Sequence, residues 1–234
     1  MPYYGYGYGY GGYGLAYSWT YLLVLAGVIV CLIASAKVRS TYNRYSSVRS
    51  MSGMTGAQAA QRILAHAGIR DVQIQHVSGN LTDHYDPREK VLRLSDSVYG
   101  SDSVAAVGVA AHECGHAIQH QRGYVPLRVR GAFVPVANFG SSIAWPLIII
   151  GLMMRGQIII EIGIICFSFA VIFQLITLPV EFNASGRAMR ILRETGILNS
   201  QELPMTGRVL RAAAMTYVAS AASAILQLLR LIIL

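Results

Sequence analysis

The chain has 234 residues, of which 54% are hydrophobic and 13% are charged, and its formal net charge is +8. Soluble proteins usually contain about 25% charged residues, so this composition argues against an ordinary soluble domain. Three cysteines do not suggest a disulfide framework. The positive charge needs no nucleic acid to explain it, because basic residues beside membrane spans meet anionic headgroups and the sequence has no nucleic-acid motif.

Residues 1–16 form a tail rich in tyrosine and glycine, which predicts a disordered or membrane-interfacial segment. The uncharged segment 17–36 follows, and it is long enough to cross a bilayer, for which about 20 residues suffice. Ala34, Ser35 and Ala36 resemble a signal-peptide cleavage site, but no positive charge precedes residue 17, as a signal peptide would require. We therefore interpret 17–36 as a retained transmembrane helix.

Three further segments, 133–154, 158–180 and 212–234, are also apolar enough to span a membrane, and the first two of them predict a helical hairpin over 133–180. Of the 19 Lys and Arg residues, 12 lie between Lys37 and Arg130 and five between Arg187 and Arg211, whereas the segment before the first span has none. The positive-inside rule therefore predicts that 37–132 and 181–211 are cytoplasmic and that the N-terminus is outside.

The polar region 37–132 has the pattern of a small α+β domain. Thr55 can cap a helix that runs to about Ala67 and that Gly68 ends. Residues 72–76 and 90–95 alternate in the manner of strands, 81–87 is expected to be extended or irregular, and a helix is predicted over 103–121. The strand before that helix could form the edge against which an extended peptide lies.

The region after the third span continues the helical pattern through 181–192, and Gly196 ends it. Residues 201–211 then lead into the fourth apolar segment. The predicted fold class is an α-helical membrane protein with about four transmembrane helices and a small α+β cytoplasmic domain.

The most informative motif, H-E-x-x-H, lies within the predicted helix 103–121 as His112, Glu113 and His116. Residues four apart in a helix lie on one face, about 6 Å apart along the axis. Two imidazoles placed in this way can bind one zinc ion, and the glutamate beside the first can reach a water on that ion. The motif therefore predicts a zinc hydrolase.

A catalytic zinc usually has a third protein ligand, for which the sequence offers three candidates. His120 is a poor one, because about 12 Å of helix separates it from His112. His84 could be a ligand, an oxyanion donor or a structural histidine. Glu181, where the third span ends, could be a ligand or an interfacial carboxylate, and spacing alone does not decide between the two. Cys114 should face away from the metal.

Three blocks of sequence resemble the YugP-type neutral zinc metallopeptidases, a family of bacterial membrane proteins. They are LTDHYDP at 81–87, AAHECGHAIQ at 110–119 and LPVEFNAS at 178–185. Their order relative to the spans is also similar to that in the HtpX and CAAX-processing membrane proteases, which place a glutamate zinc ligand in an E-[FY]-x-A-D block. The resemblance implies that Glu181 completes a gluzincin-like His₂Glu zinc site. Ser185 stands where those proteases have the aspartate, whose supporting role is therefore in doubt here.

The expected activity is that of a zinc metalloendopeptidase. Zinc lowers the pKa of its bound water toward about 7, and Glu113 accepts the proton of that water and passes it to the leaving amine. His84, Tyr85 and Arg187 are candidate substrate or oxyanion donors. The expected substrates are membrane proteins or unfolded proteins at the cytoplasmic face of the bacterial inner membrane, which would suit a role in protein quality control.

Two other classes of function stay open at the sequence level. A catalytically silent membrane scaffold could keep zinc for stability, although Glu113 counts against it, since a purely structural site needs no base. Four spans would also permit a transporter, but the sequence shows neither an inverted repeat nor a pair of broken helices.

Overall fold

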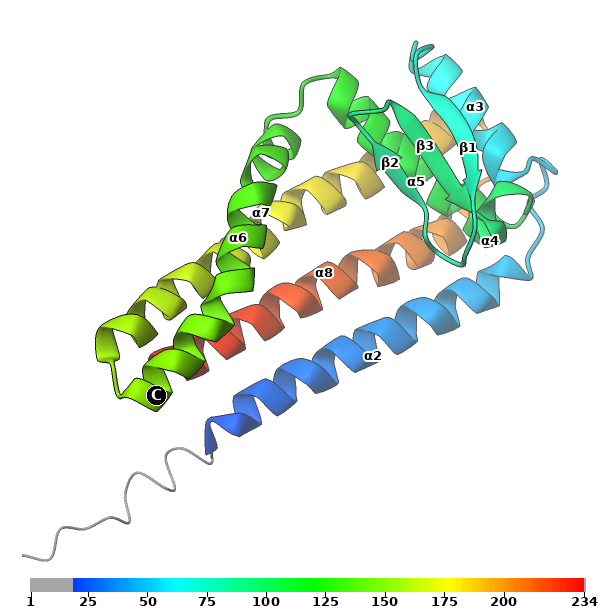
Figure 1. The fold of residues 1–234 in the computed structure, drawn as a ribbon. Helices are drawn as coiled ribbons and strands as arrows, with labels where there is room; N and C mark the ends of the chain where they lie inside the picture. The colour runs from blue at the N-terminus through cyan, green and yellow to red at the C-terminus, as the bar shows by residue number, and fades with distance from the viewer. Residues whose placement is uncertain (1–18, 234) are drawn as a thin grey trace, which may run out of the picture.

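The computed structural model describes residues 19–233 (Figure 1). The tyrosine- and glycine-rich tail therefore lies outside the described residues. Four of the helices are long and apolar enough to cross a membrane: α2 (Tyr21–Ser46), α6 (Val125–Met154), α7 (Gln157–Thr195) and α8 (Glu202–Ile233). Each of the four predicted spans falls largely within one of these helices. The protein is thus mostly helical, with four candidate membrane-spanning helices.

The shorter elements gather at one end of the long helices (Figure 1). In chain order they are α3 (Gly56–His66), β1 (Gln73–Val77), β2 (His84–Asp86), β3 (Val91–Ser95), α4 (Asp96–Tyr99) and α5 (Val104–Gln121). The two main helices here begin where the sequence predicts, after Thr55 and Ser103. Thr55 and Gln58 form a reciprocal capping box, and the Ser103 hydroxyl accepts a hydrogen bond from the Ala106 amide.

The sheet has three strands in the order β1-β3-β2, with β1 parallel and β2 antiparallel to β3. The prediction that the strand before the motif helix forms the sheet edge was therefore wrong for β3, which is central and buried on both faces. The short strand β2, in the segment expected to be extended or irregular, takes an edge position instead. The sequence did not indicate β2 as the edge strand, because three residues are too few to show an alternating pattern.

Helix α5, which carries the H-E-x-x-H motif, is the centre of the core. Nearly all of its side chains are buried, against α3 on one side and against α7 and α8 on another. Burial on several sides explains why α5 shows no amphipathic pattern in its sequence. The core cluster around it includes Ala59, Ile63, Leu92, Leu94, Val107, Ala111, Cys114 and Leu192.

Helix α7 continues without a break from the third predicted span into this core. The polar helix predicted over 181–192 is thus its last part, and Gly196 ends it in the left-handed conformation. Glu181 lies in the interior of this helix and is 2% exposed. Helix α7 therefore holds Glu181, which comes at the end of an apolar segment, beside the motif helix α5.

Helices α5 and α7 approach each other closely at Gly115, inside the motif. A Cβ atom added there would lie 2.6 Å from the backbone carbonyl oxygen of Ala184. Real Cβ atoms do not come so near to a backbone oxygen, so a larger residue would push the two helices apart. Glycine at this position sets how near the motif histidines can come to residues on α7.

Substitution of Gly115 by alanine should lower the free energy of unfolding by about 1–3 kcal/mol, the usual range for overpacking. The matched control is Gly186→Ala on α7, where an added Cβ meets nothing within 4 Å and the gain in helix propensity should make the change neutral or stabilising. Thermal unfolding in detergent measures both. A Gly115→Ala protein as stable as Gly186→Ala would contradict the importance of this close approach.

Candidate metal centre

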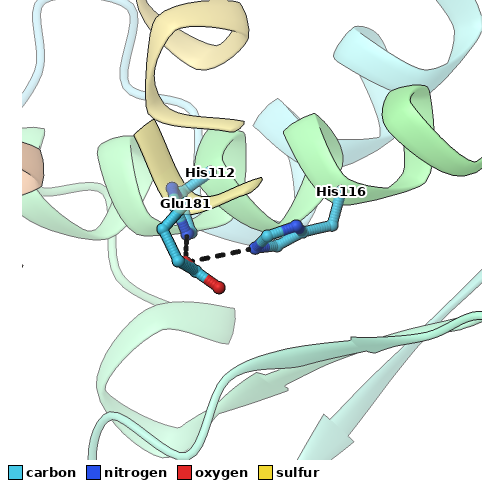
Figure 2. A group of neighbouring side chains, drawn as sticks. All are labelled: His112, His116 and Glu181. Atoms are coloured by element: carbon cyan, nitrogen blue, oxygen red, sulfur yellow. Dashed lines mark ion pairs between the residues drawn. The ribbon is translucent and has the colours of Figure 1, made fainter. Parts of the chain in front are cut away.

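Three side chains converge where α5 faces α7. His112 and His116 project from α5, and Glu181 projects from α7 toward both imidazoles (Figure 2). The Oε2 atom of Glu181 lies 3.3 Å from Nε2 of His112 and 3.6 Å from Nε2 of His116. One potential ligand atom from each of the three residues lies within 4.8 Å of the others, an arrangement that could hold one metal ion.

The Glu181 carboxylate is buried but incompletely satisfied. Its Oε1 atom lies 3.4 Å from Nη1 of Arg130. Its Oε2 atom has no hydrogen-bond partner among the described residues, although it faces both imidazole nitrogens. An unsatisfied buried carboxylate oxygen is costly, and a cation between it and the imidazoles would remove the cost. Two histidines and one glutamate also form a donor set that suits zinc.

His116 is held from behind by a buried glutamine. Its Nδ1 atom lies 3.0 Å from Oε1 of Gln119, whose amide nitrogen donates to the Val180 carbonyl oxygen and to Oδ1 of Asn183. Because both of these partners are acceptors, the amide oxygen of Gln119 must face the imidazole. Nδ1 of His116 therefore carries the proton, and the lone pair of Nε2 points toward Glu181, as metal binding requires.

His112 has a different support. The hydroxyl of Ser185 lies 3.2 Å from its Nδ1 atom. When Nδ1–H donates to that oxygen, the Nε2 lone pair faces Glu181 as it does in His116. Ser185 stands at the position where the sequence pattern of HtpX and CAAX-processing proteases has an aspartate, and its hydroxyl can still orient the imidazole, although without a negative charge.

The electrostatics of the centre favour positive charge. Burial alone would lower the pKa of His116, but the neighbouring Glu181 and Glu113 carboxylates outweigh it and raise the pKa above its ordinary value. A protonated imidazole and a metal ion respond to the same negative field. The centre therefore attracts cations despite the net positive charge of the whole chain.

The centre opens into two cavities, of about 530 and about 210 Å³, which share five lining residues: Asp83, His112, Glu113, Glu181 and Tyr217. The larger is otherwise lined by the end of α5, by β2 and the residues after it, and by the start of α6, and many of its residues are polar or basic. The smaller lies between α2 and α8 and is mostly apolar, with Val38, Leu81, Val109, Val209 and Leu210 among its lining residues. The three converging side chains are thus next to two cavities, each with room for part of a ligand.

The predicted oxyanion donors occupy different places. His84 and Tyr85 line the larger cavity, whereas Arg187 lines neither. The Nε atom of Arg187 donates to Oδ1 of Asn183 at 2.7 Å, and its guanidinium carbon lies 5.7 Å from the ring centroid of Tyr124. The structure thus brings His84 and Tyr85, but not Arg187, to the cavity wall.

Tyr85 and His84 also differ in what they can offer to a ligand. The Tyr85 hydroxyl lies 2.8 Å from Nδ1 of His120, and burial raises the pKa of Tyr85 to about 12, so that the hydroxyl stays protonated. His120 is engaged there and is not one of the three converging residues. Nδ1 of His84 lies 2.9 Å from the Thr82 carbonyl oxygen, which leaves Nε2 for another partner.

Two residues of the site were missed in the sequence. Arg130 counted only as one of many basic residues beside a span, and Tyr217 lies within an apolar segment, where a tyrosine suggests no function. The structure brings Arg130 to Glu181 and puts Tyr217 in both cavities. Cys114 lies on the far side of α5, where its thiol contacts the Ala60 carbonyl oxygen at 3.7 Å.

Comparisons with known proteins agree with this arrangement. A family described as "Putative neutral zinc metallopeptidase" matches residues 20–234. The chain is also 47% identical to the "Putative membrane protease YugP" of Bacillus subtilis (strain 168), over 91% of this chain and 94% of that protein. No solved structure matches the chain significantly. The protein therefore belongs to the neutral zinc metallopeptidase family that this description names.

Proposed function

We propose that the protein is a membrane-embedded zinc metalloendopeptidase with a gluzincin-like His₂Glu site, in which His112, His116 and Glu181 hold the metal. The observation that carries the proposal is the buried Oε2 atom of Glu181, which faces two imidazole nitrogens without a hydrogen-bond partner among the described residues. This donor set leaves room for a fourth position, which distinguishes a catalytic zinc site from a closed structural one.

Glu113 is the proposed general base. It follows His112 directly in α5 and lines both cavities, so its carboxylate is accessible to a water and to a substrate. When bound, zinc supplies a Lewis acid that lowers the pKa of a coordinated water toward about 7. Glu113 takes a proton from the attacking water and delivers it to the leaving amine nitrogen.

The oxyanion of the substrate needs a hydrogen-bond donor close to the metal. Of the three candidates from the sequence, Arg187 is engaged with Asn183 outside both cavities, and the Tyr85 hydroxyl is engaged with His120. His84 retains Nε2, and Tyr217 lines both cavities beside Glu181. We therefore favour His84 and Tyr217 as donors.

The proposed substrates are membrane proteins or unfolded proteins that reach the site at the cytoplasmic face of the bacterial inner membrane, in keeping with a role in protein quality control. The four candidate membrane helices and the relative named a membrane protease support the location. The orientation, with the N-terminus outside and 37–132 and 181–211 inside, rests on the distribution of Lys and Arg residues.

Glu113→Gln should keep zinc but lose about 10²- to 10⁴-fold in hydrolysis, because the amide cannot accept the proton. Glu181→Ala should lose zinc, because a buried ligand is removed. The measurements are zinc stoichiometry and cleavage of an unstructured protein by the detergent-purified full chain. Equal cleavage by wild type and Glu113→Gln would rule out this mechanism and favour the silent zinc scaffold.

Gln119→Leu should weaken zinc binding about 10- to 100-fold, the usual effect of removing the hydrogen-bond partner of a ligand histidine. Competition with a chelator measures the affinity without reference to activity. The matched control is Gln121→Leu on the same helix, where the side chain is exposed and lines neither cavity. A folded Gln119→Leu protein with wild-type zinc affinity would show that His116 does not depend on this support.

Tyr217→Phe should lower kcat about 10²-fold, within the range for loss of one oxyanion donor, and leave zinc stoichiometry unchanged. Removal of the hydroxyl keeps the aromatic ring and therefore the packing of α8. Steady-state kinetics with the same unstructured substrate provide the test. A variant that changes KM alone would assign Tyr217 to substrate binding and not to the stabilisation of the oxyanion.

A further inference from the structure

A third cavity, of about 570 Å³, lies between α2 and α8 and shares no residue with the two cavities of the metal centre. Four basic residues line it: Lys37, Arg44, Arg208 and Arg211. We call it the basic cavity. Figure 1 shows why two distant parts of the chain meet there, since α2 and α8 lie side by side.

The basic cavity carries positive charge that the protein does not neutralise. No acidic residue lines it, and within residues 19–233 none of its four cations makes an ion pair with an aspartate or glutamate. Four like charges around one hollow repel one another. A bound anion would relieve that repulsion.

A buried tyrosine fixes part of this charge in place. Tyr45 is 5% exposed, and its hydroxyl accepts a hydrogen bond from Nη1 of Arg208 at 2.8 Å. The guanidinium carbon of Arg44 lies 5.7 Å from the centroid of the Tyr45 ring. Guanidinium groups present several N–H donors in one plane, which matches the oxygens of a phosphate.

The level of the basic cavity relative to the membrane indicates that a phosphate bound there would belong to a lipid headgroup. Lys37 follows directly on the uncharged segment 17–36, and Arg211 directly precedes the apolar segment 212–234. Both helices therefore leave the hydrocarbon region at this level, where headgroups lie. Basic pockets between transmembrane helices on the cytoplasmic side bind the headgroups of anionic lipids.

We propose that the basic cavity binds the phosphate of an anionic phospholipid headgroup and so joins α2 to α8 at the membrane surface. This proposal does not depend on zinc or on peptidase activity. The phosphate would be contacted from two helices by Lys37, Arg44 and Arg211, and Arg208, held by Tyr45, would approach it in a fixed orientation.

Native mass spectrometry of the full chain in non-ionic detergent tests the proposal, because no charged membrane surface is then present. Phosphatidylglycerol should form a saturable one-to-one adduct, and phosphatidylcholine with the same acyl chains should bind more weakly. Lys37→Gln and Arg211→Gln should each weaken the phosphatidylglycerol adduct about fivefold, the usual effect of one basic residue.

Arg39→Gln is the matched control. Arg39 lies on α2, two residues from Lys37 and at nearly the same depth, but it does not line the basic cavity. The control should bind phosphatidylglycerol as the wild type does. An equal loss with Arg39→Gln, or equal binding of the two lipids, would overturn the proposal. Displacement of the lipid by millimolar inorganic phosphate would assign the cavity to a free anion and overturn the lipid assignment.

Discussion

The buried carboxylate of Glu181 is the constraint on which the rest of the structure depends. It lies on a helix that continues from an apolar segment, and it must meet two imidazoles on another helix within a few ångströms. That meeting requires backbone contact between the helices, which only a residue without a Cβ permits at Gly115. It also requires α5 to be enclosed, and the sheet, α3 and α8 provide the enclosure.

The existence of the long helices and the beginnings of α3 and α5 could be predicted from the sequence, because these signals are local, whereas α6 begins at Val125, before the predicted span 133–154. Thr55 and Ser103 each precede a helix that a side chain can cap, and about 20 apolar residues define a span whatever surrounds it. The edge of the sheet could not be predicted in this way. Strand order depends on which segments pair, and β2 is too short to show a pattern, so the longer and more regular β3 was taken for the edge.

The residues of the candidate site also fall into two groups, those that a local sequence pattern predicts and those that it does not. His112, Glu113 and His116 form a local motif on one helix, but Glu181 was ambiguous from spacing alone and gained weight only from the family resemblance. Arg130 lies just before the predicted span 133–154, and Tyr217 lies within a segment that composition assigns to the membrane. No local pattern marks such residues, because the packing of α6 and α8 against α7 alone brings them to the site.

The supports of the two imidazoles share one property, their lack of charge, that would bear on the chemistry of a bound metal. Gln119 and Ser185 are both neutral, whereas an aspartate behind a ligand histidine would add negative charge and raise the basicity of the imidazole. With neutral supports, Glu181 is the one anionic member of the proposed ligand set. A metal ion held by these residues would keep more of its positive charge and would be a stronger Lewis acid.

Residues of the candidate membrane helices α2 and α8 also line the site. Their positions along these helices indicate the depth of the site relative to the membrane surface. Tyr217 follows Arg211 by six residues on α8, which is about 9 Å along a helix. If Arg211 marks the level of the headgroups, Tyr217 lies about 9 Å deeper, toward the hydrocarbon. On α2, two neighbouring residues line different cavities: Lys37 lines the basic cavity, and Val38 lines the smaller cavity of the metal centre. The smaller cavity thus has walls from the long helices α2 and α8 and also from residues outside the predicted spans, such as Leu81 and Val109.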